Sequence, residues 1–202
     1  MKMKTINWKN ALYIILILSA VIATINWSIS GRTLGFEFII DSISLSVACV
    51  SILCAIFCTV LWKLPVFRKW LVLIPDLNGK WDGLIESDWI IPGTNVRVAP
   101  IKAELNIKQS LFKISCVMKT GDMRSDSISA DFNIDDANQK YQLVYIYMSI
   151  PKQNSQVGSP IHYGSMMFDF EDNYNIEKMS GNYWTGRKTC GHISVERILK
   201  RI

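Results

Sequence analysis

Two long uncharged apolar stretches near the start of the chain limit its fold more than any other feature. The first runs from Ala11 to Trp27 and the second from about Ser42 to Trp62, and neither contains a charged residue. A membrane-spanning helix needs about 20 mostly apolar residues, with about 17 as the lower limit. Both stretches meet this requirement, so the sequence predicts two transmembrane helices.

A cleaved signal peptide is the alternative interpretation of the first stretch, since it also joins a basic start to an apolar run. The run is long for a signal peptide, and it ends in Asn26-Trp27-Ser28 instead of a small-x-small cleavage site. Trp8 and Trp27 bracket the first stretch and Trp62 closes the second, as interfacial aromatic residues do. We therefore expect a two-helix membrane anchor that contacts the lipid bilayer.

Basic residues outside the two stretches predict how the anchor is oriented. Three precede the first stretch and three follow the second: Lys2, Lys4, Lys9, Lys63, Arg68 and Lys69. The connecting loop, residues 29–41, carries one basic residue, Arg32, against Glu37 and Asp41. The positive-inside bias then places both termini and everything after the anchor in the cytoplasm, with the anchor as a multi-pass segment of the membrane.

The chain changes character after Pro75. Residues 63–78 form a connector that contains Pro65 and Pro75, and from Gly79 onward apolar and polar residues alternate with period two. We therefore divide the chain into residues 1–75, an anchor with its juxtamembrane connector, and residues 76–202, a β domain. That length allows one modest hydrophobic core.

The alternation predicts eight short strands in the second domain. Their expected bounds are about 79–88, 100–109, 111–120, 125–134, 140–150, 161–171, 178–187 and 190–199. Short Gly- and Asn-containing connectors favour antiparallel hairpins, so the predicted fold is an eight-stranded antiparallel up-and-down β-barrel behind two transmembrane helices. A two-sheet sandwich is the alternative. A barrel has the advantage that it leaves no exposed strand edge.

The same alternation predicts which side chains face the barrel interior. We expect an inward row in the fourth strand to include Ile128, and we expect the interior to contain Ile101, Leu105, Phe112, Ile114, Phe132 and Phe168. The fifth strand is apolar on both faces, so it is expected to touch something outside the barrel as well. Trp81, at the start of the first strand, is expected to close one end of the barrel beneath Arg197 of the last strand through a cation–π contact.

The composition argues against several classes of function. The five cysteines form no CxxC pair, which is consistent with a reducing compartment and gives no support for a zinc ribbon or a redox motif. The two histidines, His162 and His192, belong to no metal-binding pattern, and no nucleotide-hydrolase or hydrolase motif is present. A net charge of +5 is too small to argue for DNA or RNA binding. We therefore predict no catalytic residue, no metal and no cofactor, while a cryptic enzyme site near His192 is a third hypothesis.

The densest group of polar and aromatic residues lies between Gly181 and His192. It contains cations and hydroxyls that suit phosphate oxygens and rings that suit a nucleobase: Tyr183, Trp184, Thr185, Arg187, Lys188 and Thr189. Strand alternation places Tyr183, Thr185 and Arg187 on one face and Trp184 on the other. A solvated hairpin turn explains the same composition, and at this point both interpretations stay open.

These features together resemble a known family. The two apolar stretches, the segment Leu77-Asn78-Gly79-Lys80-Trp81 and the segment Tyr183 to Thr189 resemble the two-transmembrane, β-strand-rich effectors of bacterial cyclic-oligonucleotide anti-phage signalling (CBASS). The resemblance covers essentially the whole chain. It implies a β-barrel that binds a cyclic dinucleotide made by a partner nucleotidyltransferase. It also implies self-association in the bacterial inner membrane, membrane disruption and death of the infected cell.

The alternative to this reading is a membrane-tethered barrel of the lipocalin type that binds an apolar small molecule. It rests on the predicted apolar interior, which either fills a small barrel or lines a lipid pocket.

Small residues in the second stretch, among them Ser42, Ser46 and Cys49, favour close helix association and are the expected means of oligomerisation.

Overall fold

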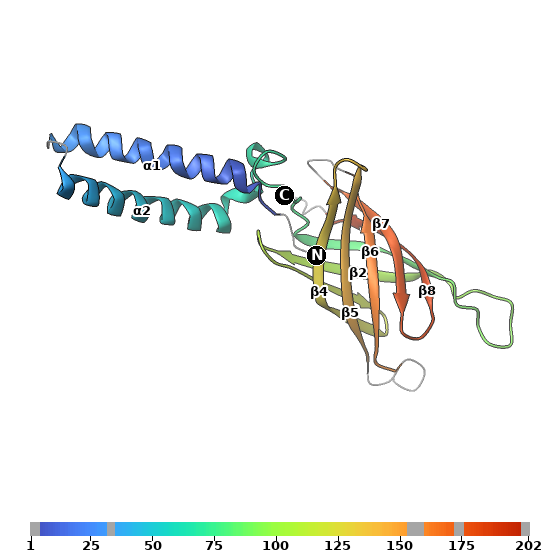
Figure 1. The fold of residues 1–202 in the computed structure, drawn as a ribbon. Helices are drawn as coiled ribbons and strands as arrows, with labels where there is room; N and C mark the ends of the chain where they lie inside the picture. Colours follow the sequence, from blue (N-terminus) through green and yellow to red (C-terminus); the bar gives the residue numbers. More distant parts are fainter. Residues whose placement is uncertain (1–4, 32–34, 153–159, 172–175, 199–202) are drawn as a thin grey trace. The chain divides into compact units, whose positions relative to one another are not determined.

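The computed structural model of the chain contains two compact units, one from Lys4 to Pro75 and the other from Asp76 onward (Figure 1). It describes residues 5–31, 35–152, 160–171 and 176–198. Lys2, Lys4 and Arg32, used above to predict orientation, and the last residue of the predicted eighth strand, Leu199, lie outside the described residues. That these units act as an anchor and a cytoplasmic ligand-binding domain stays a prediction.

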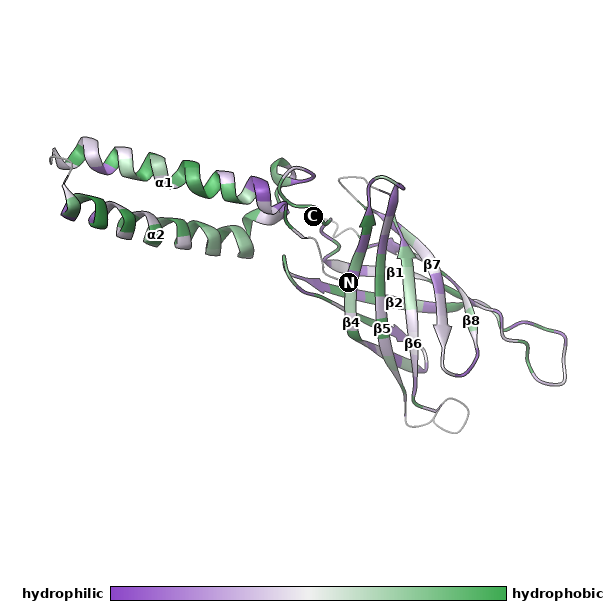
Figure 2. Cartoon of the chain, in the orientation of Figure 1, coloured by the Kyte–Doolittle hydropathy of each residue, from purple (hydrophilic) through white to green (hydrophobic). Residues whose placement is uncertain are grey.

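The first unit contains two long helices, α1 (Trp8–Ser30) and α2 (Phe36–Thr59). Both are long and apolar enough to cross a membrane, and Figure 2 shows their mainly hydrophobic colouring. The predicted second stretch began six residues too late, because Glu37 and Asp41 led us to place its start at Ser42. Glu37 lies in the first turn of α2, where the positive end of the helix dipole favours an acid.

Polar groups connect the two helices. Asn26 Nδ2 donates to Ser42 Oγ at 2.9 Å, and the Ser46 hydroxyl lies 3.4 Å from the carbonyl of Ser19. Ser42 and Ser46 are both buried on the side of α2 that meets α1. Small residues permit this close approach, and the hydrogen bonds satisfy polar groups between two apolar helices.

The connector after α2 pairs with the residues that precede α1. It contains two 3₁₀ turns, η1 (Leu61–Lys63) and η2 (Pro65–Phe67). Backbone hydrogen bonds of 2.9 Å join Asn7 N to Leu71 O and Leu73 N to Thr5 O. The connector is therefore an ordered part of the first unit, and Trp62 lies buried in η1 beyond the end of α2.

The second unit is a closed barrel in which each strand pairs with its neighbours in sequence and β1 pairs with β8. Every pairing is antiparallel, so the predicted eight-stranded up-and-down barrel is confirmed and the sandwich alternative is wrong. The strands are β1 (Gly79–Ser87), β2 (Ile101–Gln109), β3 (Ile114–Thr120), β4 (Met123–Asp135), β5 (Lys140–Pro151), β6 (His162–Asp169), β7 (Lys178–Thr185) and β8 (Cys190–Arg197).

Inward-facing side chains fill the end of the barrel where β1 begins. The largest fully buried ones include Trp81, Leu105, Leu143, Phe168 and Met179. At the opposite end the connector between β1 and β2 extends away from the barrel and is closed by a 3.0 Å hydrogen bond from Ile91 N to Val96 O. The fully buried core therefore lies at the end of the barrel where β1 begins.

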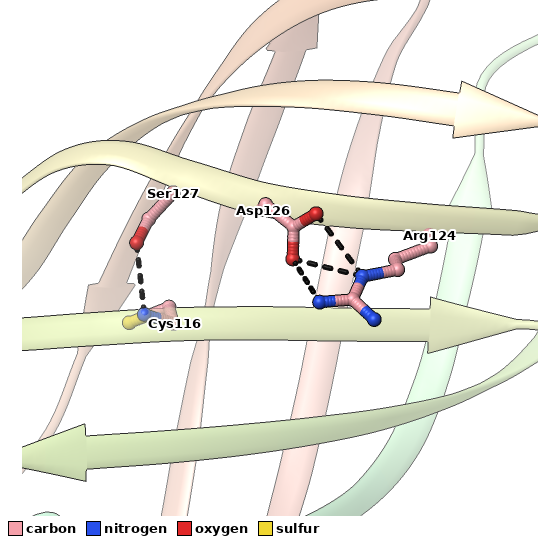
Figure 3. Close-up of polar contacts among 4 residues, drawn as sticks. All are labelled: Cys116, Arg124, Asp126 and Ser127. Atoms are coloured by element: carbon pink, nitrogen blue, oxygen red, sulfur yellow. Dashed lines mark hydrogen bonds and ion pairs between the residues drawn. The ribbon is translucent and has the colours of Figure 1, made fainter.

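Two predicted interior residues are outside the barrel. Phe112 is exposed because β3 begins only at Ile114, and the preceding turn buries Leu111 instead. Ile128 is exposed because a bulge between Ser127 and Ser129 reverses the expected alternation along β4. Ser127 Oγ accepts the backbone N–H of Cys116 at 2.9 Å (Figure 3), which satisfies that N–H where the β3–β4 register ends at Val117.

Candidate ligand-binding cavity

A cavity of about 400 Å³ lies in the mouth of the barrel at the end away from Trp81. Its walls come from the last residues of β1, β3, β5 and β7, the first residues of β2, β4 and β6, and the turn between β7 and β8. Trp89 and Val98, at the base of the β1–β2 connector, also line it. Its volume is within the range of small-molecule sites, about 300–1,000 Å³.

Three tyrosines form one side of this cavity. Tyr145 and Tyr147 come from β5 and Tyr183 from β7, and their inward direction follows from strand alternation. Burial raises the pKa of Tyr147 to about 12 and raises the pKa of Tyr183, so both phenols stay protonated at neutral pH. They can therefore donate hydrogen bonds and offer ring faces to a ligand.

Two glycines make room for two of these rings. Gly164 is the cross-strand partner of Tyr147, and Gly191 is the partner of Tyr183. A β-carbon at position 164 would clash with Cζ and the hydroxyl of Tyr147, and one at position 191 would lie 2.8 Å from Cε1 of Tyr183. The absence of a side chain at these positions leaves the space that the two rings occupy.

Hydroxyl groups line the rest of the mouth. The side-chain oxygens of Ser125 and Ser149 lie 2.6 Å apart across β4 and β5, and those of Thr185 and Thr189 lie 2.7 Å apart across the β7–β8 turn. Lys188 has the left-handed backbone angle φ of 62° that closes this turn. Both pairs retain lone pairs or protons that a polar ligand could engage.

Arg187 brings a permanent positive charge to the cavity. It lies in the β7–β8 turn, held by hydrogen bonds from Lys188 N to Thr185 O at 3.1 Å and from Arg187 N to Thr185 Oγ1 at 3.3 Å. The other ionisable side chains in the described lining, besides the tyrosines, are His162 and Asp122. Arg187 next to two hydroxyls suits a phosphate group.

The sequence-predicted binding residues divide into two groups. Tyr183, Thr185, Arg187 and Thr189 all line the cavity. Trp184 does not, because it follows Tyr183 on a strand and so faces outward with 47% of its surface exposed. Lys188 is exposed at the tip of the turn and does not line the cavity either. None of these positions is tested for ligand binding, so their roles stay predictions.

Sequence reasoning missed the contribution of the other strands. Tyr145, Tyr147 and Ser149 of β5 lie two residues apart, and this spacing was the available signal that they share the inner face. That they line the same cavity as the β7–β8 turn depends on how the strands curve around the barrel, which the spacing alone does not reveal. Ser125 and His162 approach the cavity for the same reason.

Trp81 and Arg197 are neighbours at the other end of the barrel. They are cross-strand partners on β1 and β8, and the guanidinium carbon lies 4.6 Å from the centre of the indole ring. Arg197 Nη2 also donates to the carbonyl of Asp76 at 2.7 Å, and Trp81 Nε1 donates to Leu77 O at 3.2 Å. That this pair serves to close the barrel stays a prediction.

A larger hollow of about 590 Å³ lies beside β6, β7 and β8, but its chemistry suits an anion poorly. Its described lining contains four carboxylates and one cation, Lys178. Those carboxylates are Asp169, Glu171, Glu177 and Glu196. Among the described residues, no group of three or more His, Cys, Asp or Glu side chains could hold a metal ion. The mouth cavity is therefore the better candidate for a phosphate-bearing ligand.

Comparisons with known proteins agree with this choice of chemistry. The family described as "Cap15, cyclic dinucleotide receptor domain" matches residues 72–197. A CD-NTase-associated protein 15 from Staphylococcus schleiferi is 23% identical over 195 residues, which cover 96% of this chain and 94% of that protein. A CD-NTase-associated protein 15 from Yersinia aleksiciae is 31% identical over 143 residues, which cover 68% of this chain and 62% of that protein.

Proposed function

Since this chain belongs to the Cap15 cyclic dinucleotide receptor family, we propose that its cavity at the barrel mouth binds a cyclic dinucleotide as the input of an anti-phage CBASS response. The observation that carries the proposal is the grouping of Arg187, the Thr185–Thr189 hydroxyl pair and the tyrosine wall in one cavity. In this role the chain acts as a receptor and effector, and it performs no catalytic step.

Each part of the cavity has a complementary part of the ligand. Arg187 and the threonine hydroxyls bind a phosphate, since a guanidinium and neutral donors both suit phosphate oxygens. Tyr147 and Tyr183 stack on a base, because their rings face the cavity and an aromatic–base stack contributes about 1–3 kcal/mol. Trp184, one of the two rings first considered for stacking, faces away and takes no part.

The alternative of an apolar ligand, in the manner of lipocalins, is less well supported by the lining. A deep apolar pocket would need the interior beyond the mouth to be hollow, but Trp81, Leu105 and Phe168 are fully buried there. The mouth itself carries serine and threonine hydroxyls and a guanidinium, which would be costly to cover with a lipid chain.

The proposed output is self-association of the membrane helices and disruption of the membrane. The buried serines of α2 already contact α1 within one chain, so other small residues must serve contacts between chains. Ser44, Ala48, Ser51 and Ala55 are exposed and lie three or four residues apart, on one side of α2. Small residues at this spacing allow close helix packing in lipid.

The proposed location is the bacterial inner membrane, with both termini and the barrel in the cytoplasm. Lys9 in the first turn of α1 and Lys63, Arg68 and Lys69 after α2 support this orientation, since basic residues favour the cytoplasmic side. In this location the barrel meets the product of a partner nucleotidyltransferase, which senses infection.

Titration of the full chain in lipid nanodiscs tests the proposed ligand. Isothermal calorimetry with a panel of cyclic dinucleotides, and with the linear dinucleotides as controls, should show saturable binding of at least one cyclic compound. Native mass spectrometry of the same sample checks the alternative. Failure of every cyclic dinucleotide to bind folded protein, together with a co-purified lipid in the barrel, would replace this proposal by the apolar-ligand alternative.

A further inference from the structure

One side of the barrel exposes an apolar surface that the proposed ligand site does not use. It runs across β4, β5, β6 and β7, and we call it the outer apolar face. Its members are 37% to 62% exposed: Ile128, Ile146, Ile150, Ile161, Tyr163 and Trp184. This surface explains the apolar character of both faces of the fifth strand that was evident in the sequence.

Strand register makes the outer apolar face continuous. Ile146 and Trp184 are both cross-strand partners of Ser165, one on each side of it. Tyr163 is the partner of Met148, and Ile150 and Ile161 lie one step beyond the Ser149–His162 pair. Ile128 joins the face because the β4 bulge turns it outward.

Charge is confined to the border of this face. None of its six described members is charged, although 19% of the chain's residues are. The nearest described charges on β4, Arg124 and Asp126, form an ion pair with N–O distances of 3.0 Å, shown in Figure 3. A partner could therefore cover the face without burying an unpaired charge, which would be costly.

The size of the face is close to that of a protein interface. Aromatic side chains carry on the order of 200 Å² each and isoleucines less, so six side chains that are about half exposed offer at most about 600 Å². A standard interface buries about 800 Å² per partner, and patches of a few hundred Å² on a monomer often mark an interaction site. A charge-free face also suits a second copy, because residues 76–202 contain 15 basic and 15 acidic residues, so two barrels carry no net charge that would repel them.

The outer apolar face and the ligand cavity are two sides of the same wall. Ile146 lies between Tyr145 and Tyr147 on β5, while Trp184 lies between Tyr183 and Thr185 on β7. A ligand that orders the inner side chains also fixes the positions of the outer ones. Ordering the wall once, on ligand binding, lowers the entropy cost of a later contact on its outer side.

From these observations we infer that the outer apolar face binds the same face of a second copy of this chain. Such a two-fold contact is the commonest form of homo-oligomer. We also infer that ligand in the mouth cavity strengthens the contact, and this second part rests on the proposed function. Paired barrels then bring the membrane helices of two chains close together. The helices complete the assembly through contacts of their own.

Charge substitutions in the full chain test the inference. Tyr163→Lys and Tyr163→Glu each place like charges across the two-fold contact, and Leu84→Lys on β1 is the matched control at a 43% exposed apolar position outside the face. Sedimentation in detergent, with and without the cyclic dinucleotide that binds, measures the dissociation constant for self-association. Calorimetry measures ligand binding, and thermal unfolding checks that each variant is folded.

We expect each Tyr163 variant to raise the dissociation constant at least about tenfold, as like charges across an interface do. A mixture of the Lys and Glu variants should restore association, and Leu84→Lys should behave as the native chain. Folded Tyr163 variants that associate as the native chain does would overturn the inference. That result is expected if lipid or another protein, instead of a second copy, covers the face. Ile146→Lys replaces them if they do not fold.

Measuring self-association without ligand tests the inference independently of the proposed function. If the native chain binds no cyclic dinucleotide, the proposed function fails, yet concentration-dependent association that Tyr163→Lys weakens still supports the face. If ligand binds and association does not depend on Tyr163, the proposed function stands and the inference fails.

Discussion

The ring of Tyr147 on β5 lies against the backbone of Gly164, its cross-strand partner on β6, in contact with the place that a side chain at position 164 would occupy. A side chain at position 164 would push this ring out of its place in the cavity wall. The width of the ligand cavity thus depends on a glycine whose own backbone conformation needs no special freedom. It depends instead on the space that the glycine leaves.

Gly164→Ala should therefore both destabilise the barrel and weaken ligand binding. A methyl group here has to displace the Tyr147 ring or the strand, and overpacking of this kind costs about 1–3 kcal/mol. Gly121→Ala is the control, because a β-carbon at position 121 would meet nothing within 4 Å. Urea unfolding followed by tryptophan fluorescence should show a lower midpoint for the first variant and an unchanged one for the second. Equal midpoints would contradict this account of Gly164.

Arg187→Gln should weaken cyclic dinucleotide binding by about 10- to 100-fold, since a hydrogen bond to a charged group is worth about 1.5–3 kcal/mol. Lys188→Gln removes the same charge from the adjacent position, which does not line the cavity. Calorimetry of both variants separates a specific phosphate contact from general attraction. Equal losses in the two variants would show that only the local positive charge matters.

Arg197→Met should destabilise the closed end of the barrel. It removes the cation–π contact with Trp81, worth about 0.5–2 kcal/mol, and the charged hydrogen bond to Asp76 O, worth about 1.5–3 kcal/mol. We expect a loss of about 2–4 kcal/mol in the free energy of unfolding. Arg124→Met, which breaks an exposed ion pair on β4, should change it little. Thermal unfolding of the two variants measures the difference. Small and similar shifts in melting temperature would rule out a structural role for the Trp81–Arg197 pair.

Stability should fall at alkaline pH because buried acidic groups, Cys116 and Tyr147 among them, resist ionisation in the folded state. Burial raises the pKa of Cys116 from 9.0 to about 12 and the pKa of Tyr147 from 10.0 to about 12. Below pH 9 both groups are protonated in both states, so their contribution is fully present. Between pH 9 and 12 the unfolded chain ionises while the folded barrel does not, which favours unfolding by about 1.4 kcal/mol per unit of pKa difference.

Urea midpoints measured from pH 8 to pH 11 test this dependence. The native chain should lose stability steadily above pH 9, and Tyr147→Phe combined with Cys116→Ala should lose less, relative to its own value at pH 8. Parallel curves for the two proteins would show that other groups control alkaline unfolding.

The sequence by itself determined the two apolar helices, the eight short strands and the placement of Tyr183 and Trp184 on opposite faces of one strand, because hydrophobic length and strand alternation are local properties. Local patterns misplaced Phe112 and Ile128, since the start of β3 and the bulge in β4 depend on pairing with neighbouring strands. Only the tertiary structure brought Tyr147 of β5 to the same cavity as Arg187 of the β7–β8 turn, and only it turned Trp184 from a ligand contact into part of an outer face. These relationships arise when the barrel closes, and closure is a property of all eight strands together.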